Sequence, residues 1–272
     1  MRAENLRQSR GNSLTSSSDI EVSKDDGVAT VRLRRPRVRN AITLAMWEAT
    51  ASIFEGFGSD EDVRAVILTG ELPDFSVGAD ISEFSMVRAT ADQSAAYEET
   101  VDAASEAITR CSKPIIAVVN GYCLGGACHL AMACDFRFAR QDARFGIPAA
   151  RLSIVYGVRS TDRLRNIVGL SHAKRILYSA EQFDGLRALE IGFADQIADD
   201  PMASARDFAL RLACNAPLSI SGAKLILNGL SRGAPDVEHL AKIAIDSAAE
   251  SADYKEGTKA FAEKRPPVFR GR

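Results

Sequence analysis

The sequence predicts an α/β (α+β) fold that ends in an all-helical region, and three observations lead to this prediction. Short β-branched runs alternate with segments of helical period through residues 20–200. From about Pro201 the strand patterns stop, and four helical segments follow, with breaks marked by Pro217, Gly233 and Pro235. At 272 residues, the chain is long enough for one large domain with an appendage.

The first expected elements are a hairpin and a helix. Two alternating runs, IEVS and VATVRLR, flank an Asp-Asp-Gly turn at residues 25–27, which predicts a β-hairpin. Between residues 43 and 57 the period changes, because Leu44, Trp47 and Phe54 recur at helical spacing. Thr43 can cap the first turn of this helix.

Alternating strands and helices are expected next. Strands are predicted at residues 63–69 and 114–119, with a helix at about 91–110 between them. A helix after Gly125 and two short strand-like segments, DFRFA and ARFGI, complete the α/β part. We therefore expect residues 19–200 to form a catalytic core. Residues 201–272 should form a helical region that makes subunit contacts.

The N-terminus and the cysteines indicate the cellular compartment of the protein. Residues 1–18 are polar and aperiodic, which predicts a disordered tail, and Glu4 argues against a transit peptide. The five cysteines are odd in number, lie mostly in apolar sequence and lack CxxC spacing. We expect reduced, structural thiols in a cytoplasmic protein rather than disulfides or a metal site.

The charge balance argues against polyanionic partners. The chain carries 34 Lys+Arg against 36 Asp+Glu, so it has no excess of positive charge that would favour binding to nucleic acid or to an anionic membrane. The uncharged run from Pro114 to Cys134 has about the length of a membrane span, roughly 20 residues. Because Asn120 and three glycines interrupt it, we expect a buried strand, a turn and a buried helix instead.

Two glycine-bearing turns are the candidate chemical features, since GxSxG, HExxH and GxxxxGK[ST] signatures are missing. Gly125 and Gly126 follow one buried strand and would open a helix, whose first N–H groups lack acceptors. The N–H of Ala79, released by Gly78 after the other strand, can aim at the same point, as in an oxyanion hole. From the pattern alone, the alternative remains that the two glycines only allow close packing at the start of a helix.

Five blocks of sequence occur in the order and spacing of one family. They are RRPRVRNAI (34–42), AVILTGELPDFSVGADISEF (65–84), KPIIAVVNGYCLGGACHLAMACDFRFA (113–139), FGIPAARLSI (145–154) and FAEKRPPVF (261–269). Together they resemble the crotonase, or enoyl-CoA hydratase/isomerase, family over nearly all the chain from Ile20 onward. The resemblance implies a spiral of ββα units around an acyl-CoA site. It also implies a C-terminal helical region that builds homotrimers, often paired into hexamers.

The resemblance also implies roles for individual residues. The amides of Ala79 and Gly126 would polarise a thioester carbonyl and stabilise the enolate. Coenzyme A would enter as part of the substrate, so no permanently bound cofactor and no metal is expected. For Lys264, a solvated charge in a basic tail stays an equal alternative. The CoA contacts would be Val77, Asp80 and Ile81 at the adenine, Arg37 and Val38 at the pyrophosphate and pantetheine, and Phe261 and Lys264 at the nucleotide end.

The sequence departs from the hydratase pattern at both acid/base positions. Typical hydratases use two glutamates, one three residues after the oxyanion glycine and one directly after the proline of an FGxP-type segment. Here these positions hold His129 and Ala149. Hydration of simple enoyl-CoAs should therefore be poor. Isomerase activity, which commonly uses the second position, is equally in doubt.

Two titratable residues remain near the implied acyl group. Burial in the first turn of a helix would keep His129 neutral, so that it could act as a base or a hydrogen-bond donor. An inert histidine on an apolar helix face is the alternative. Tyr156 falls where relatives place acyl-pocket or acid/base residues, and it could donate a proton or only wall the pocket. The leading prediction is an acyl-CoA enzyme, and the alternatives are a non-catalytic acyl-CoA-binding subunit or a specialised hydrolase.

Overall fold

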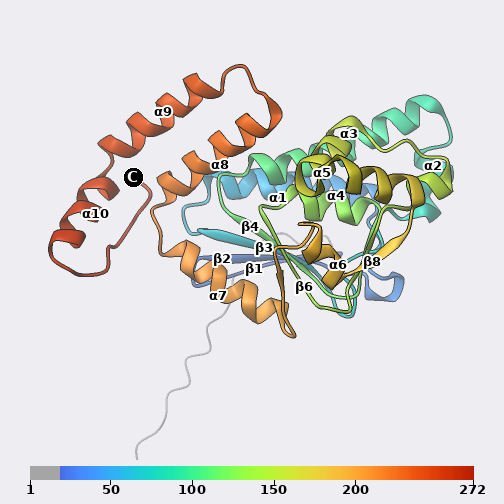
Figure 1. Cartoon of the computed structure of the whole chain (residues 1–272), viewed down its shortest axis with the longest axis horizontal. Coiled ribbons are helices and arrows are strands. Elements are labelled where there is room, and N and C mark those ends of the chain that lie inside the picture. Colours follow the sequence, from blue (N-terminus) through green and yellow to red (C-terminus); the bar gives the residue numbers. More distant parts are fainter. Residues whose placement is uncertain (1–18) are drawn as a thin grey trace, which may run out of the picture.

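A six-stranded sheet forms the centre of the computed structural model, which describes residues 19–272 (Figure 1). The tail predicted for residues 1–18 lies outside the described residues. The first two strands pair antiparallel, and all the others are parallel. In sheet order the strands are β1 (Ile20–Asp25), β2 (Val28–Leu33), β3 (Ala65–Gly70), β4 (Ile115–Val119), β6 (Phe136–Ala139) and β9 (Gln196–Ile197).

The predicted hairpin is confirmed. β1 and β2 pair in register from Ile20 opposite Leu33 to Asp25 opposite Val28. Asp26 and Gly27 turn the chain with φ of +50° and +76°. Such a two-residue turn of Asp and Gly matches the twist of the two strands.

The sheet is covered on both faces, which explains its continuous apolar strands. Side chains of β3 and β4 alternate, so that Val66 and Leu68 face one hydrophobic core and Ala65 and Ile67 the other. Figure 1 shows helices on both sides of the sheet. The larger core packs against α1 (Leu44–Ser59), α3 (Ala91–Arg110), α4 (Gly126–Ala133) and α5 (Val158–Ser179), and the smaller one against α7 (Pro201–Ala213).

The helix boundaries follow local capping signals. The hydroxyl of Thr43 accepts a hydrogen bond from the N–H of Met46 and caps α1. Thr90 and Gln93 form a reciprocal capping box at the start of α3. Short elements complete the core, namely η1 (Pro36–Val38), η2 (Ile81–Glu83), α2 (Phe84–Val87), η3 (Pro148–Leu152) and α6 (Gly185–Glu190).

The uncharged run of residues 114–134 is divided between β4, β5 (Tyr122–Leu124) and α4, as predicted. Among residues 19–272, no helix combines the length and the apolar character that a membrane span requires. β5 pairs with β7 (Arg144–Gly146), which in turn pairs with β8 (Gln182–Asp184) in a separate small sheet. A separate bridge between Cys123 of β5 and Ser76 places the turn before α4 beside the loop that follows β3.

The predicted boundary at residue 200 does not coincide with a change of packing. Ala205 and Ala209 of α7 are buried against the central sheet, so this helix belongs to the core layer. A helical pattern gives the apolar face of a helix but not the surface that covers it, which is why the sequence placed α7 in the appendage. Helix α8 (Pro217–Arg232) stays beside the core, where Lys224 pairs with Asp135 and Asn228 donates a hydrogen bond to the carbonyl oxygen of Thr109. Helices α9 (Val237–Glu250) and α10 (Ala252–Ala262) extend away from the sheet (Figure 1).

One buried asparagine joins the loops at the carboxyl ends of the strands. Asn40 is fully buried and has a φ of +55°, a conformation that asparagine tolerates better than most residues. Its Nδ2 donates hydrogen bonds to the carbonyl oxygens of Glu71 (2.7 Å) and Asp74 (2.8 Å). Its Oδ1 accepts one from the N–H of Arg35 (2.9 Å), and its carbonyl accepts one from the Ser76 hydroxyl (2.7 Å).

Replacing this asparagine should destabilise the whole fold. Asn40→Ala leaves two carbonyl oxygens and one N–H without partners and keeps an unfavourable φ, so we expect a loss of roughly 2–4 kcal/mol in the free energy of unfolding. Urea denaturation followed by circular dichroism measures it. Asn166→Ala, at an exposed position of α5, is the control and should change the stability by less than about 0.5 kcal/mol.

Candidate active site

Two glycine turns come into contact where β3 and β4 end. Both turns need a positive φ, which is +91° at Gly78 and +54° at Gly125. A Cβ atom on Gly78 would lie 2.4 Å from the carbonyl oxygen of Leu124, so only glycine allows this approach. Two backbone hydrogen bonds hold the turns together, from Ser76 N–H to Tyr122 (2.9 Å) and from Leu124 N–H to Ser76 (3.1 Å).

Two backbone N–H groups are left free at this contact. A β-bridge joins Ile42 to Ala79. Its two hydrogen bonds are made by the residues on either side of Ala79: the N–H of Ile42 donates to the carbonyl oxygen of Gly78 (2.8 Å), and the N–H of Asp80 donates to that of Ile42 (2.9 Å). The N–H of Ala79 therefore points elsewhere. Gly126 is the first residue of α4, and within residues 19–272 neither its N–H nor that of Ala79 has an acceptor. The two groups are neighbours, since a Cβ on Gly126 would lie 3.5 Å from the nitrogen of Ala79.

A small, mostly apolar cavity of about 120 Å³ opens beside these amides. Ala79, Gly125 and Gly126 line it together with both positions where the sequence departs from the hydratase pattern, His129 and Ala149. The remaining wall comes from α1, α2, α3 and the segment after η3. It includes Trp47, Val77, Ile81, Phe84, Arg88, Tyr97, Glu98, Val101, Leu152, Ile154, Val155 and Tyr156.

Comparisons with known proteins agree with this arrangement. The family model for enoyl-CoA hydratase/isomerase matches residues 23–272. The chain is 34% identical to a probable enoyl-CoA hydratase of Bacillus subtilis over 93% of its own length and 98% of that protein. It is 32% identical to the 2,3-dehydroadipyl-CoA hydratase of Escherichia coli, over 94% and 100%.

The chain belongs to the enoyl-CoA hydratase/isomerase family. A crystal structure of an enoyl-CoA hydratase/carnithine racemase from Magnetospirillum magneticum superposes with a TM-score of 0.90 at 31% identity. That match covers 96% of this chain and 97% of the other. The expected crotonase-type fold and the membership in a family of enzymes are thereby confirmed.

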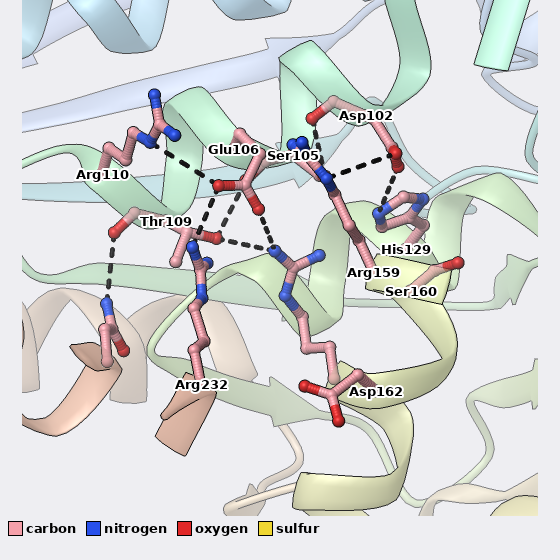
Figure 2. A network of polar contacts seen from close by, with 12 residues as sticks. Asp102, Ser105, Glu106, Thr109, Arg110, His129, Arg159, Ser160, Asp162 and Arg232 are labelled. Atoms are coloured by element: carbon pink, nitrogen blue, oxygen red, sulfur yellow. Dashed lines mark hydrogen bonds and ion pairs between the residues drawn. The ribbon is translucent and has the colours of Figure 1, made fainter. Parts of the chain in front are cut away.

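His129, one of the two expected departures from the hydratase pattern, is buried and neutral. Its side chain is 3% exposed, and burial, assisted by the charge of Arg163, lowers its pKa from 6.5 to about 3. Its Nε2 has no hydrogen-bond partner within the described chain and lies 3.9 Å from Oδ1 of Asp102. Figure 2 shows Asp102 between His129 and Arg159. An imidazole with so low a pKa is a weak base at pH 7.

Tyr156 also lines the cavity. Its hydroxyl donates a long hydrogen bond of 3.4 Å to the carbonyl oxygen of Gly125, and its ring centroid lies 6.1 Å from that of His129. Burial raises the pKa of the phenol well above its usual value, so the hydroxyl keeps its proton. Ala149 also lines the cavity, with a side chain that is only a methyl group.

The residues implied for coenzyme A are not all brought together. Val77 and Ile81 line the cavity. The carboxylate of Asp80 bonds the Ser82 hydroxyl (2.6 Å) and the Arg35 guanidinium (2.8 Å), and both interactions lower its pKa. The residues that stay apart from the cavity are Arg37 and Val38, on the exposed η1, and Phe261 and Lys264, at and just after the end of α10.

Phe261 and Lys264 lie far from the cavity of their own chain, so their expected contact with the nucleotide end stays a prediction. Phe261 is 88% exposed, and α10 lies at the opposite end of the molecule from α2 and α3, which border the cavity (Figure 1). The position of a C-terminal helix is set by contacts far along the chain, so the local sequence could not reveal it.

The sequence did not predict that Trp47, Tyr97 and Glu98 line the cavity. The indole Nε1 of Trp47 donates a hydrogen bond of 3.0 Å to the hydroxyl of Tyr97, which fixes α3 against α1 beside the cavity. Glu98 follows Tyr97 and is the one carboxylate that lines the cavity in the described part of the chain. The helical spacing of Tyr97 and Val101 marks the inward face of the expected helix, and it could have indicated that Glu98 lies at the edge of that face.

Lowering the pH should destabilise the folded protein because His129 is buried in its neutral form. In the unfolded chain a histidine binds a proton below about pH 6.5, whereas folded His129, with a pKa of about 3, stays neutral until the pH falls that far. The free energy of unfolding therefore decreases as the pH falls through this window. This histidine alone should cost roughly 3 kcal/mol by pH 4.

Urea titrations at pH 7 and pH 4 measure this effect. His129→Gln should show a smaller difference between the two pH values than the wild-type protein. His239→Gln, which changes an exposed histidine of α9, should leave the difference unchanged. Equal differences in all three proteins would contradict the buried neutral state of His129.

Proposed function

We propose that this enzyme acts on acyl-CoA thioesters by stabilising an enolate through the backbone N–H groups of Ala79 and Gly126. The single observation that carries the proposal is the pair of free, adjacent amides at the wall of an apolar cavity. Fixed N–H donors in a site of low dielectric constant stabilise negative charge on a carbonyl oxygen more than water does. A thioester oxygen that gains charge when its α-carbon loses a proton fits this role.

Hydration of simple enoyl-CoAs should be slow. Addition of water requires one group to deprotonate the water and another to protonate the α-carbon. His129 is a weak base, and Ala149 carries no exchangeable proton. The proposal therefore favours reactions that need only proton removal and return at carbon, or a specialised reaction such as hydrolysis.

The size of the cavity favours a short acyl group. Cavities of about 150 Å³ hold a benzene ring. The cavity here is about 120 Å³, which suits an acyl group of roughly four or five carbon atoms. Butyryl-CoA and crotonyl-CoA are therefore the probes of choice.

A non-catalytic acyl-CoA-binding protein is the competing function. The weak basicity of His129 and the alanine at position 149 favour it. The two functions differ in one measurement. A binding protein would hold butyryl-CoA without exchanging the hydrogens of its α-carbon with solvent, whereas an enolate-forming enzyme would exchange them.

The first test is therefore α-hydrogen exchange. We expect the wild-type protein to introduce deuterium at the α-carbon of butyryl-CoA in D₂O, followed by mass spectrometry. Gly78→Ala should lower the rate by roughly 100-fold or more, because its Cβ separates the two amides. Gly58→Ala, on an open helical surface of α1, should leave the rate unchanged. Binding without any exchange would support the competing function.

Restoring both glutamates should create hydratase activity. The variant His129→Glu with Ala149→Glu places carboxylates at the two positions where family hydratases carry them. We expect its hydration of crotonyl-CoA to exceed that of the wild-type protein by about 100-fold or more. Each single variant should gain less than the double variant, because it adds only one of the two carboxylates. No gain in the double variant would mean that the positions do not face the acyl group.

We propose further that α8 to α10 assemble the enzyme into a homotrimer, alone or paired into a hexamer, in the cytoplasm. Several large apolar side chains of these helices are exposed in the single chain, among them Leu227, Leu230, Ile243, Ile245 and Tyr254. Light scattering should give three or six times the chain mass of 29.3 kDa. A monomeric mass would contradict the assembly.

A further inference from the structure

A carboxylate reaches the cavity from α3, an element that carries neither of the family's glutamate positions. The carboxylate is that of Glu98, which lines the cavity together with Ala79, Gly126, His129 and Ala149. Its side chain is 43% exposed, so it lies at the rim, where it can exchange protons with solvent. Asp102, one turn further along α3, does not line the cavity.

Direct contacts fix this part of α3 beside the oxyanion amides. The ring of Trp47 lies against Gly126, since a Cβ built there would be 3.0 Å from the ring. The Trp47 indole bonds the hydroxyl of Tyr97, the residue before Glu98, at 3.0 Å. A chain of two contacts therefore links the backbone of Gly126 to the residue next to Glu98.

An arginine orients the carboxylate of Glu98. The Nη2 of Arg88 lies 2.9 Å from one carboxylate oxygen of Glu98, and among residues 19–272 the second oxygen has no partner. The guanidinium of Arg88 itself stacks against the rings of Phe84 and Tyr97, about 5 Å from each centroid (5.0 and 5.1 Å), which restricts its position. Partial burial raises the pKa of Glu98 above its ordinary value, although Arg88 opposes this shift.

We propose that Glu98 is the catalytic base that removes the α-proton of a short acyl-CoA thioester and returns it. The inference rests on the proposed function, because it needs the enolate that Ala79 and Gly126 stabilise. It assigns the acid/base role to α3 in an enzyme whose two usual carboxylate positions hold His129 and Ala149.

The proposed step is a balanced proton transfer. The free oxygen of Glu98 takes the proton from the α-carbon, and the C–H electron pair forms the carbon–carbon double bond of the enolate. The carbonyl π electrons move to the thioester oxygen, which accepts hydrogen bonds from the N–H groups of Ala79 and Gly126. Return of a proton or a deuteron from the carboxylic acid to the same carbon restores the thioester. No electron is gained or lost overall.

The experiment compares neighbouring glutamates of one helix. Glu98→Gln removes the base but keeps the shape of the side chain. Glu99→Gln, the matched control, changes an exposed residue of α3 that does not line the cavity. Deuterium incorporation into butyryl-CoA in D₂O gives the rate, and calorimetry gives the dissociation constant of butyryl-CoA.

We expect Glu98→Gln to lower the exchange rate by roughly 100-fold or more, while the dissociation constant stays within about threefold of wild type. Glu99→Gln should exchange at the wild-type rate. Glu98→Asp keeps a carboxylate on a shorter stem and should retain part of the activity, which guards against a loss caused only by misfolding.

Two other outcomes separate this inference from the proposed function. Wild-type exchange that persists in Glu98→Gln would overturn the role of Glu98 and leave the enolate proposal intact. An absence of exchange in the wild-type protein, despite tight binding of butyryl-CoA, would overturn both.

Discussion

The close approach of two backbone turns is the constraint on which the site depends. The loop after β3 and the turn before α4 touch at Gly78 and Leu124, at a distance that a side chain on Gly78 would prevent. The parallel register of β3 and β4, with Thr69 opposite Val118, delivers both loops to the same edge of the sheet. Asn40 then ties the first loop to the segment after β2. The free amides of Ala79 and Gly126 are a consequence of this arrangement, not of any side chain at the site.

The same enclosure has opposite effects on different groups in the cavity. Low dielectric constant strengthens the attraction between fixed N–H dipoles and a developing oxyanion. It penalises the imidazolium of His129, whose pKa falls to about 3, and the phenolate of Tyr156, whose pKa rises. The deepest titratable groups are therefore held in their neutral forms, where they serve as walls or hydrogen-bond partners. A group that must gain and lose a proton belongs at the rim, where Glu98 lies.

Local sequence patterns predict most of the helices and strands, whereas features that depend on tertiary contacts could not be predicted. The hairpin at residues 20–33 and the capped helix at 91–110 follow from periodicity and turn chemistry, which neighbouring residues determine. The three-residue strands β5, β7 and β8 are too short to carry a period, so the sequence could not predict their separate sheet. The side of the sheet that α7 covers depends on distant residues, and so does the place of Phe261. Glu98 has the spacing of an ordinary solvated residue on an amphipathic helix, and only the contact between Tyr97 of the same helix and Trp47 of α1 holds it at the cavity.

In the proposed site, the groups that stabilise charge are separate from the group that carries the proton, so the site does not need a carboxylate at position 129 or 149. The amides proposed to stabilise charge belong to the main chain, so their place does not depend on the side chains of His129 and Ala149. Any element that reaches the same cavity can then supply a proton carrier. Helix α3 meets this requirement because Trp47 holds it next to Gly126, and Arg88 fixes the orientation of the carboxylate it presents. In the proposed mechanism, the backbone therefore sets the class of intermediate, and the helix that borders the cavity supplies the group that transfers the proton.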